Sequence, residues 1–155
     1  LKCMQRLGPR YHLLLVGSSM PAVVPDNVSV INEFCTAATV ARLMASADAL
    51  LHAGDQETFG LVILEAMACG IPVVAVAAGA FEEIVTDSCG LLCAPNNPQA
   101  MANAVRELFS RGVSKLGAQA RQHVEHHYAW DTVVDSLLSH YHAVLGHAMP
   151  RVANG

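Results

Sequence analysis

Short unbroken apolar runs alternate along this chain with longer segments whose apolar residues recur every three or four positions. The runs are rich in Val, Leu and Ile and are bounded by glycine, proline or polar turns, a pattern that predicts strands. Five strands are expected, at 11–16, 27–31, 49–53, 73–77 and 91–93.

The longer segments follow the 3.6-residue period of a helix. In the first clear case Val40, Leu43, Met44 and Ala47 fall on one face, behind Thr36 or Thr39 as a capping residue. Glycine and proline set other helix limits, because proline suits the first helical turn and glycine the position after the last. Further helices are expected from Gly60 to Ala68 before Gly70, from Asn97-Pro98 to Gly112, from Ser114 onward, and from Trp130-Asp131.

Strands without polar alternation, separated by amphipathic helices, indicate a parallel sheet that is covered on both faces. We therefore predict an α/β fold, an open parallel sheet of Rossmann type. Such sheets bind ligands beyond the carboxyl ends of their strands. Gly17, Gly54 and Gly79 each follow a predicted strand and so belong to that edge, although Gly17 and Gly79 also suit simple turns.

Composition narrows the class of protein. The chain has 155 residues, of which 53% are apolar and 14% charged, so one ordered domain with a sizeable core is expected. A net charge of −4 argues against a nucleic-acid partner. The apolar runs are interrupted before they could span a bilayer and no signal-peptide pattern opens the chain, so no segment inserted in a membrane is expected. The reduced thiols described next fit a cytoplasmic protein.

The cysteines indicate reduced thiols. Five is an odd number, and no Cys-x-x-Cys pair is present. Cys69, Cys89 and Cys93 lie in apolar surroundings, which favours buried free thiols over a disulfide or a metal.

The histidines indicate no metal site either. His123, His126 and His127 share the spacing that can grip a metal on a helix, but no third ligand is evident, so solvated side chains are favoured. His52, at the end of the third strand, is expected to have its hydrogen bonds satisfied. No metal and no cofactor are expected.

Two glutamates carry the strongest chemical signal. Glu57 and Glu65 lie eight residues apart and bracket a predicted junction between a turn and a helix. The helical neighbours of Glu65 are mainly apolar, and a carboxylate is costly to bury on such a surface without a hydrogen-bonding partner. We favour a ligand as that partner. An internal basic residue for Glu65, and a helix-start role for Glu57, are the alternatives.

The segment 54–65 resembles the Glu-x7-Glu motif of retaining glycosyltransferases with the two-domain GT-B fold, family four of that class. The likeness continues through both sides of the motif and covers roughly residues 11 to 141, in the same order. The matching features are 47–51, 65–75, Gly79, 83–85, 90–92, Pro95, Trp130 and Tyr141.

This resemblance implies a site for a nucleotide-sugar donor. Glu65 would bind the ribose, and Glu57 would act as the catalytic-site carboxylate on the transferred sugar. The helix starting near Gly60 points its free N–H groups and positive dipole end toward the ligand edge, where a diphosphate would lie. The resemblance assigns further donor sugar and phosphate contacts to Thr58, Phe59, Gly60, Leu61 and Gly17.

Several departures from the family pattern bear on this site. Ala53-Gly54 replaces a frequent Pro-Ser, Ala80 replaces the second of two glycines, and Glu82 replaces a frequent proline. Glu83 suits either a ligand-binding or a solvated, capping role. The Arg and Lys that neutralise the diphosphate in the family lie upstream of the helix in which this chain opens.

The opening Leu1–Leu7 has no initiator Met and no cap, so we expect the C-terminal part of a longer two-domain enzyme. Residues 1–155 would form one donor-binding domain, inactive alone, while a missing N-terminal domain would bind a glycan, lipid or small-molecule acceptor. The helix at 130–146 would pack on that domain, on a second copy or back on its own domain. The full-length protein would allow peripheral attachment at the inner membrane face. The alternatives are another GT-B enzyme, such as a nucleotide-sugar epimerase or a phosphorylase-like enzyme, or a degenerate interaction domain.

Overall fold

The structure, a computed structural model, describes residues 1–17, 21, 23–56 and 58–148. Helices and strands alternate along most of this part, which confirms the predicted α/β class. The strands are β1 (Leu13–Val16), β2 (Val28–Ile31), β3 (Leu50–His52), β4 (Val73–Val76) and β5 (Gly90–Cys93). The helices are α1 (Lys2–Leu7), α2 (Ala37–Ala45), α3 (Leu61–Ala68), α4 (Phe81–Ile84), α5 (Pro98–Arg111), α6 (Val113–His127) and α7 (Trp130–Ala148).

Side chains at the expected positions begin two of the helices. The hydroxyl oxygen of Thr36 accepts a hydrogen bond from the backbone N–H of Thr39 at 3.3 Å, at the start of α2. At the start of α5, the side-chain Oδ1 of Asn97 accepts a hydrogen bond from the backbone N–H of Ala100 at 3.0 Å. Each bond satisfies a donor that the helix itself leaves unpaired, so these two predicted starts are confirmed.

All strand pairs are parallel, but the strands form two separate ladders in the described part of the chain. One ladder is β1–β2, with Leu13 opposite Val28, and the other has the order β3-β4-β5. Within the second ladder, Leu50 is opposite Val73 and Val73 opposite Gly90. The pattern of the sequence predicted parallel strands correctly but did not reveal this division.

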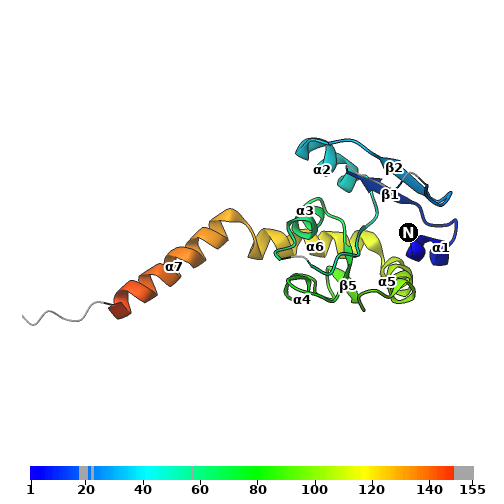
Figure 1. Ribbon diagram of the computed structural model, residues 1–155. Helices are drawn as coiled ribbons and strands as arrows, with labels where there is room; N and C mark the ends of the chain where they lie inside the picture. Colours follow the sequence, from blue (N-terminus) through cyan, green and yellow to red (C-terminus); the bar gives the residue numbers. More distant parts are fainter. Residues whose placement is uncertain (18–20, 22, 57, 149–155) are drawn as a thin grey trace, which may run out of the picture.

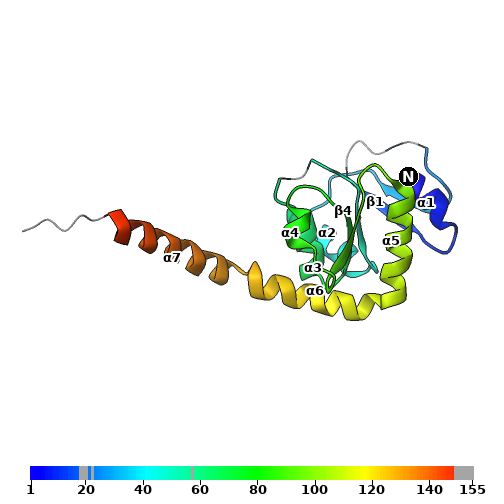
Figure 2. The same cartoon turned by 90° about the horizontal axis from the view of Figure 1, so that it is seen from below.

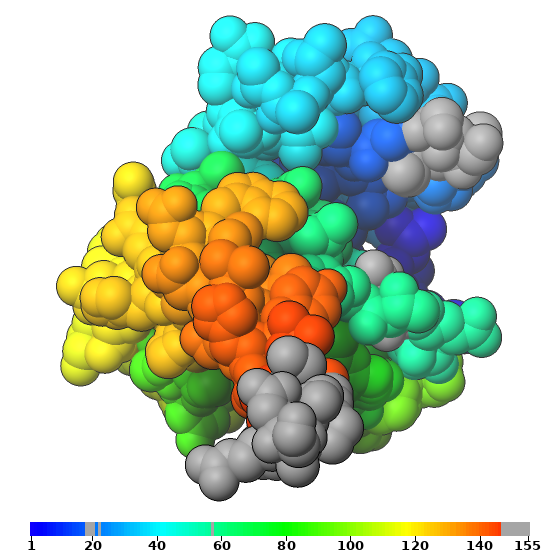
Figure 3. Space-filling model, turned by 90° about the vertical axis from the view of Figure 1, so that its left-hand side faces the viewer, coloured from blue at the N-terminus to red at the C-terminus, as the bar shows by residue number. Residues whose placement is uncertain are grey.

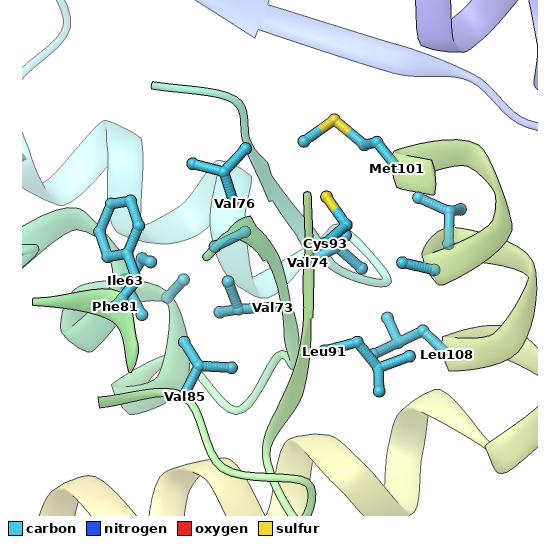
Figure 4. Packing of buried hydrophobic residues seen from close by; sticks show 14 of the residues in the cluster. Ile63, Val73, Val74, Val76, Phe81, Val85, Leu91, Cys93, Met101 and Leu108 are labelled. Carbon is cyan, nitrogen blue, oxygen red and sulfur yellow. The ribbon is translucent and has the colours of Figure 1, made fainter. Parts of the chain in front are cut away.

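Helices cover both faces of the strands, as predicted (Figures 1 and 2). In Figure 2, α1 and α5 lie on one side, while α2, α3 and α4 lie on the other. The close-up in Figure 4 shows the same layers in the core. Ile63 and Phe81 lie to one side of the strands that carry Val73 and Val74, and Leu108 lies to the other. The four residues of β4 are all buried, because this strand has a neighbour on each edge and helices on both faces.

The short helix α4 and some element limits differ from the predictions. Phe81–Ile84 is a single helical turn, too short to show a 3.6-residue period in the sequence. The first strand begins at Leu13 and not at residue 11, and α6 begins at Val113, one residue before the predicted start.

The thiols agree with the sequence only in part. None of the five cysteines forms a disulfide, and Cys89 and Cys93 are buried. Cys69 is only half-buried, because it caps the C-terminal end of α3, where its Sγ lies 3.7 Å from the carbonyl oxygen of Ala41.

The last helix leaves the body of the domain. α7 projects as a rod in Figures 1 and 2, and Figure 3 looks along it toward the domain. Its large apolar side chains are exposed: Trp130, Val133, Val134, Leu137, Leu138, Tyr141, Val144 and Leu145. It therefore does not pack back on its own domain. No helix in the described ranges has the length and apolar character needed to cross a membrane.

Candidate functional site

The N-terminal end of α3 is open. Gly60 precedes the helix with φ 80° and ψ 32°, in the left-handed region, and it makes no side-chain cap because it has no side chain. The carbonyl of Gly60 accepts from Ile63 and Leu64, at 2.9 and 3.3 Å, but the first helical N–H groups have no partner within the helix. A left-handed glycine at this point therefore begins the helix without a side-chain cap, and the positive end of the helix dipole lies here.

A hollow of about 270 Å³ lies beside this helix end. Its lining comes from three places in the chain: the loop after β3, the α4 turn after β4, and the end of α6. The lining residues are Thr58, Phe59, Ala80, Glu83, Ile84 and Tyr128. Two of the predicted donor-site residues, Thr58 and Phe59, thus line a concave surface beyond the carboxyl ends of β3 and β4, as expected for this fold.

Glu83 and Tyr128 make this hollow more polar than its apolar walls would be alone. Burial raises the pKa of Tyr128, and the negative charge of Glu83 raises it further. The phenol therefore keeps its proton and remains a hydrogen-bond donor across the ordinary pH range. The sequence left the role of Glu83 open and did not single out Tyr128, because only folding brings the end of α6 to α4.

Glu65 is exposed, contrary to the expectation of a carboxylate on an apolar, burying surface. It lies in the middle of α3, and its helical neighbours Leu61 and Ala68 are exposed with it. The apolar pattern was misleading because α3 buries its other side, around Ile63, Ala66 and Met67. Glu65 does not line the hollow and belongs to neither of the two ion pairs found among the described residues.

Three other residues were predicted for the donor site, and the structure describes two of them. Glu57 lies outside the described residues. Leu61 is the first residue of α3 and is 60% exposed. Gly17 ends β1 with φ 146° and donates its N–H to the carbonyl of Ile31 at 3.1 Å. Gly17 therefore follows a strand of the other ladder and does not line the hollow.

His52 differs from its prediction. Its ring packs edge-on against Phe81, with centroids 4.9 Å apart, and its Nδ1 is buried without a hydrogen-bond partner. The expected satisfied histidine is therefore wrong. The Phe81 ring that His52 contacts lies 3.0 Å from where a Cβ on Gly60 would stand.

Only part of the expectation for the helical histidines is met. His126 and His127 are exposed, but His123 is half-buried and its Nε2 has no hydrogen-bond partner. Its ring lies 4.8 Å from that of His127 and 5.9 Å from that of Tyr128, between ring centroids. No group of three metal-ligating side chains occurs among the residues that the structure describes.

His123 is expected to make stability depend on pH. Burial lowers its pKa, the nearby His127 lowers it further, and a hydrogen bond to the Ile84 backbone partly opposes both. The unfolded chain therefore takes up this proton at a higher pH than the folded chain does. The free energy of unfolding should be unaffected above the ordinary histidine pKa of about 6.5 and fall as the pH drops below it.

Urea unfolding between pH 8 and 5 measures this effect. His123→Gln should flatten the decline, whereas His126→Gln, on the exposed side of the same helix, should leave it unchanged. An unaltered decline in His123→Gln would assign the pH dependence to other groups.

A comparison with known protein families identifies the family to which the chain belongs. The family model described as "Glycosyl transferases group 1" matches residues 1–111. The chain therefore belongs to the glycosyl transferases of group 1.

Curated relatives agree with this family. A GDP-mannose-dependent alpha-(1-6)-phosphatidylinositol dimannoside mannosyltransferase of Mycobacterium tuberculosis is 43% identical over 100 residues, covering 64% of this chain and 26% of the relative. A D-inositol 3-phosphate glycosyltransferase of Mycolicibacterium gilvum is 33% identical, covering 87% and 34%. A GDP-mannose-dependent alpha-mannosyltransferase of Mycolicibacterium smegmatis is 34% identical, covering 91% and 38%. The chain thus spans between a quarter and two fifths of the length of these relatives.

Solved structures share the fold. Sucrose-phosphate synthase from Thermosynechococcus elongatus superposes with a TM-score of 0.76 at 25% identity, over 95% of this chain and 42% of that one. HepE of Anabaena, in complex with UDP, gives a TM-score of 0.78 at 23% identity, over 91% and 43%. The second likeness concerns the fold alone.

Proposed function

We propose that this chain is the donor-binding domain of a retaining glycosyltransferase, which transfers a sugar from a nucleotide diphosphate sugar to an acceptor. The observation that carries the proposal is the open N-terminal end of α3 behind Gly60, beside the hollow at the carboxyl ends of β3 and β4. Its unpaired N–H groups suit a diphosphate. The transferase names of the three curated relatives, two of which depend on GDP-mannose, support this function over an epimerase or a phosphorylase.

In this proposal the two glutamates hold the hydroxyl-rich ends of the donor. Glu65, exposed and in no ion pair with the residues that the structure describes, is available to accept hydrogen bonds from the ribose. Glu57 accepts them from the transferred sugar, and the backbone around Phe59 and Leu61 binds the phosphates. Stabilisation of the leaving diphosphate by N–H groups would promote cleavage of the sugar–phosphate bond. Gly17 would approach the donor from the end of β1.

Calorimetry with GDP, UDP and ADP tests donor binding by the chain. At least one nucleotide should bind, weakly, and Glu65→Gln should weaken that binding roughly 10- to 100-fold, the value of a hydrogen bond to a charged group. Glu125→Gln is the matched control, because this glutamate is exposed on α6 in a surface ion pair with Arg121. A folded chain that binds none of the three nucleotides would contradict the proposal.

The reaction itself requires the longest natural form of the protein, assayed with a nucleotide sugar and candidate acceptors. NMR of the product should show the anomeric configuration of the donor preserved. Release of a rearranged nucleotide sugar without transfer would identify an epimerase instead. We also propose that the enzyme is cytoplasmic and that its acceptor binds outside residues 1–155.

An interaction role has its own support in α7. Trp130, Val134, Leu137, Tyr141 and Val144 repeat at alternating spacings of four and three residues, which suits pairing with a second helix. An exposed stripe of this extent normally marks a binding surface. For residues 1–155 alone, we propose that the stripe pairs with α7 of a second copy.

Light scattering at several protein concentrations measures that association. The chain should shift from monomer to dimer as the concentration rises, because each copy can bury the stripe of the other. Leu137→Lys should keep it monomeric, while Ser139→Lys, off the stripe, should not. A chain that stays monomeric at every concentration would rule out self-association through α7.

A further inference from the structure

Charge is distributed unevenly between the two sides of the strands. Two stretches of sequence, 1–17 and 98–115, contain six of the nine lysines and arginines but a single carboxylate, Glu107. Residues 18–97 contain nine of the thirteen acidic residues and one basic residue, Arg42. α1 and α5 lie together on one side of the strands, and α2, α3 and α4 lie on the other (Figure 2). The side formed by α1 and α5 is therefore positive, although the chain as a whole is negative.

The basic side chains gather where α1 meets α5. Arg106 on α5 donates a hydrogen bond to the backbone carbonyl of Arg6 on α1, and Arg6 donates to the carbonyl of Lys2 at 2.9 Å. Burial raises the pKa of the Cys3 thiol, and the positive charges of Arg106 and Arg6 act in the opposite direction. Lys2, Arg6 and Arg106 are exposed and form no ion pair with any residue that the structure describes. Their charge is thus not neutralised within the described part of the domain.

An aromatic pair lies beside these cations. Tyr11, next to the exposed Arg10, meets Phe109 edge-on, with ring centroids 5.2 Å apart. Phe109 lies one turn beyond Arg106 on α5 and is 38% exposed. Aromatic rings lie at the headgroup level of a bilayer, and lysine and arginine are attracted to anionic headgroups. We name this surface the basic face: Lys2, Arg6, Arg10 and Arg106, with Tyr11 and Phe109.

We propose that the basic face binds the surface of a membrane that contains anionic lipids. Lipids can move sideways in a bilayer, so anionic headgroups can collect under a face of this small size. The acidic residues of α4 lie on the opposite side of the strands and are repelled by the same surface, which orients the domain. The hollow beside α4 therefore stays open to solvent when the basic face is bound.

A nucleic acid is a less suitable partner for the basic face. A rigid duplex follows a long track of phosphates, whereas the basic side chains here are confined to the junction of α1 and α5. The nine acidic residues of 18–97 would repel the rest of such a polyanion. The exposed aromatic ring of Phe109 also suits the apolar upper part of a lipid layer.

Vesicle sedimentation with residues 1–155 tests the proposal. The chain should bind vesicles made of equal parts of phosphatidylcholine and phosphatidylglycerol at low salt, be released as the salt concentration rises, and ignore vesicles of phosphatidylcholine alone. The double variant Lys2→Gln/Arg10→Gln should bind about 30-fold more weakly, from the usual contribution of two basic residues near an anionic surface. Neither side chain makes a hydrogen bond or ion pair with the described residues, so the fold should be kept.

The matched control is Arg42→Gln/Arg121→Gln, which removes the same charge from α2 and α6. It should bind the mixed vesicles nearly as well as the unsubstituted chain. Equal weakening in the two double variants would contradict the proposal, because net charge and not the basic face would then govern binding.

Two other results would also overturn the proposal. Binding to neutral vesicles that salt does not reverse would assign the contact to the apolar stripe of α7. A DNA duplex that binds as tightly as the mixed vesicles, and is lost in Lys2→Gln/Arg10→Gln, would identify a surface for nucleic acid instead. None of these results bears on nucleotide binding, so the proposed function can fail or stand independently.

Discussion

Replacing Gly117 with alanine is expected to lower the free energy of unfolding by about 2–4 kcal/mol. Gly117 lies buried in α6, where a Cβ would overlap the carbonyl oxygen of Gly70 and come within 3.4 Å of the Cα of Ile71. These are backbone atoms just after α3, so they cannot rotate away as a side chain could. Relief of the clash requires α3 and α6 to move apart. The gain in helix propensity from alanine, about 1 kcal/mol, is smaller than this clash.

Urea unfolding of Gly117→Ala beside Gly146→Ala isolates the effect of close packing. Gly146 is also helical, in α7, but a Cβ there would meet nothing within 4 Å. The control should be neutral or slightly more stable. If both variants unfold at the urea concentration of the unsubstituted chain, α3 and α6 do not pack as closely as described.

Gly60→Ala is expected to cost about 2–3 kcal/mol of stability and to weaken nucleotide binding. Two effects add. Alanine is disfavoured at φ 80°, and its Cβ would lie 3.0 Å from the Phe81 ring and 3.2 Å from Ile84. Phe81 cannot move aside, because it is buried and packed against His52. The first turn of α3 must shift instead, and with it the N–H groups proposed to bind the diphosphate.

Gly70→Ala is the matched control for this position. Gly70 has nearly the same φ, 81°, but open space where its Cβ would stand. Gly70→Ala should lose only about 1 kcal/mol of stability, the cost of placing alanine in a left-handed backbone conformation. It should leave nucleotide binding intact. Urea unfolding and calorimetry on the same samples separate the two effects. Equal losses in both variants would show that contact with Phe81 contributes nothing.

The candidate site could be predicted only in part from the sequence. The junction between a turn and a helix near Gly60 could be predicted because a turn, a glycine and an apolar helix follow one another locally in the chain, whereas the left-handed conformation of Gly60 came from the structure. The exposure of Glu65 was not, since it depends on which side of α3 meets the core around Met67. The contribution of Tyr128 was also hidden, because it arises from contact between α6 and α4.

The sequence by itself determined the class of fold, most helix limits and the family likeness. These follow from local causes: apolar periodicity, the caps at Thr36 and Asn97, and a run of residues around 57–75 that keeps its order. Only the tertiary structure decided that the strands form two ladders, that α7 stands free, and that the hollow joins three distant segments. The physical reason is that strand pairing and burial depend on contacts between residues far apart in the sequence. A local sequence pattern does not identify which distant residues make these contacts.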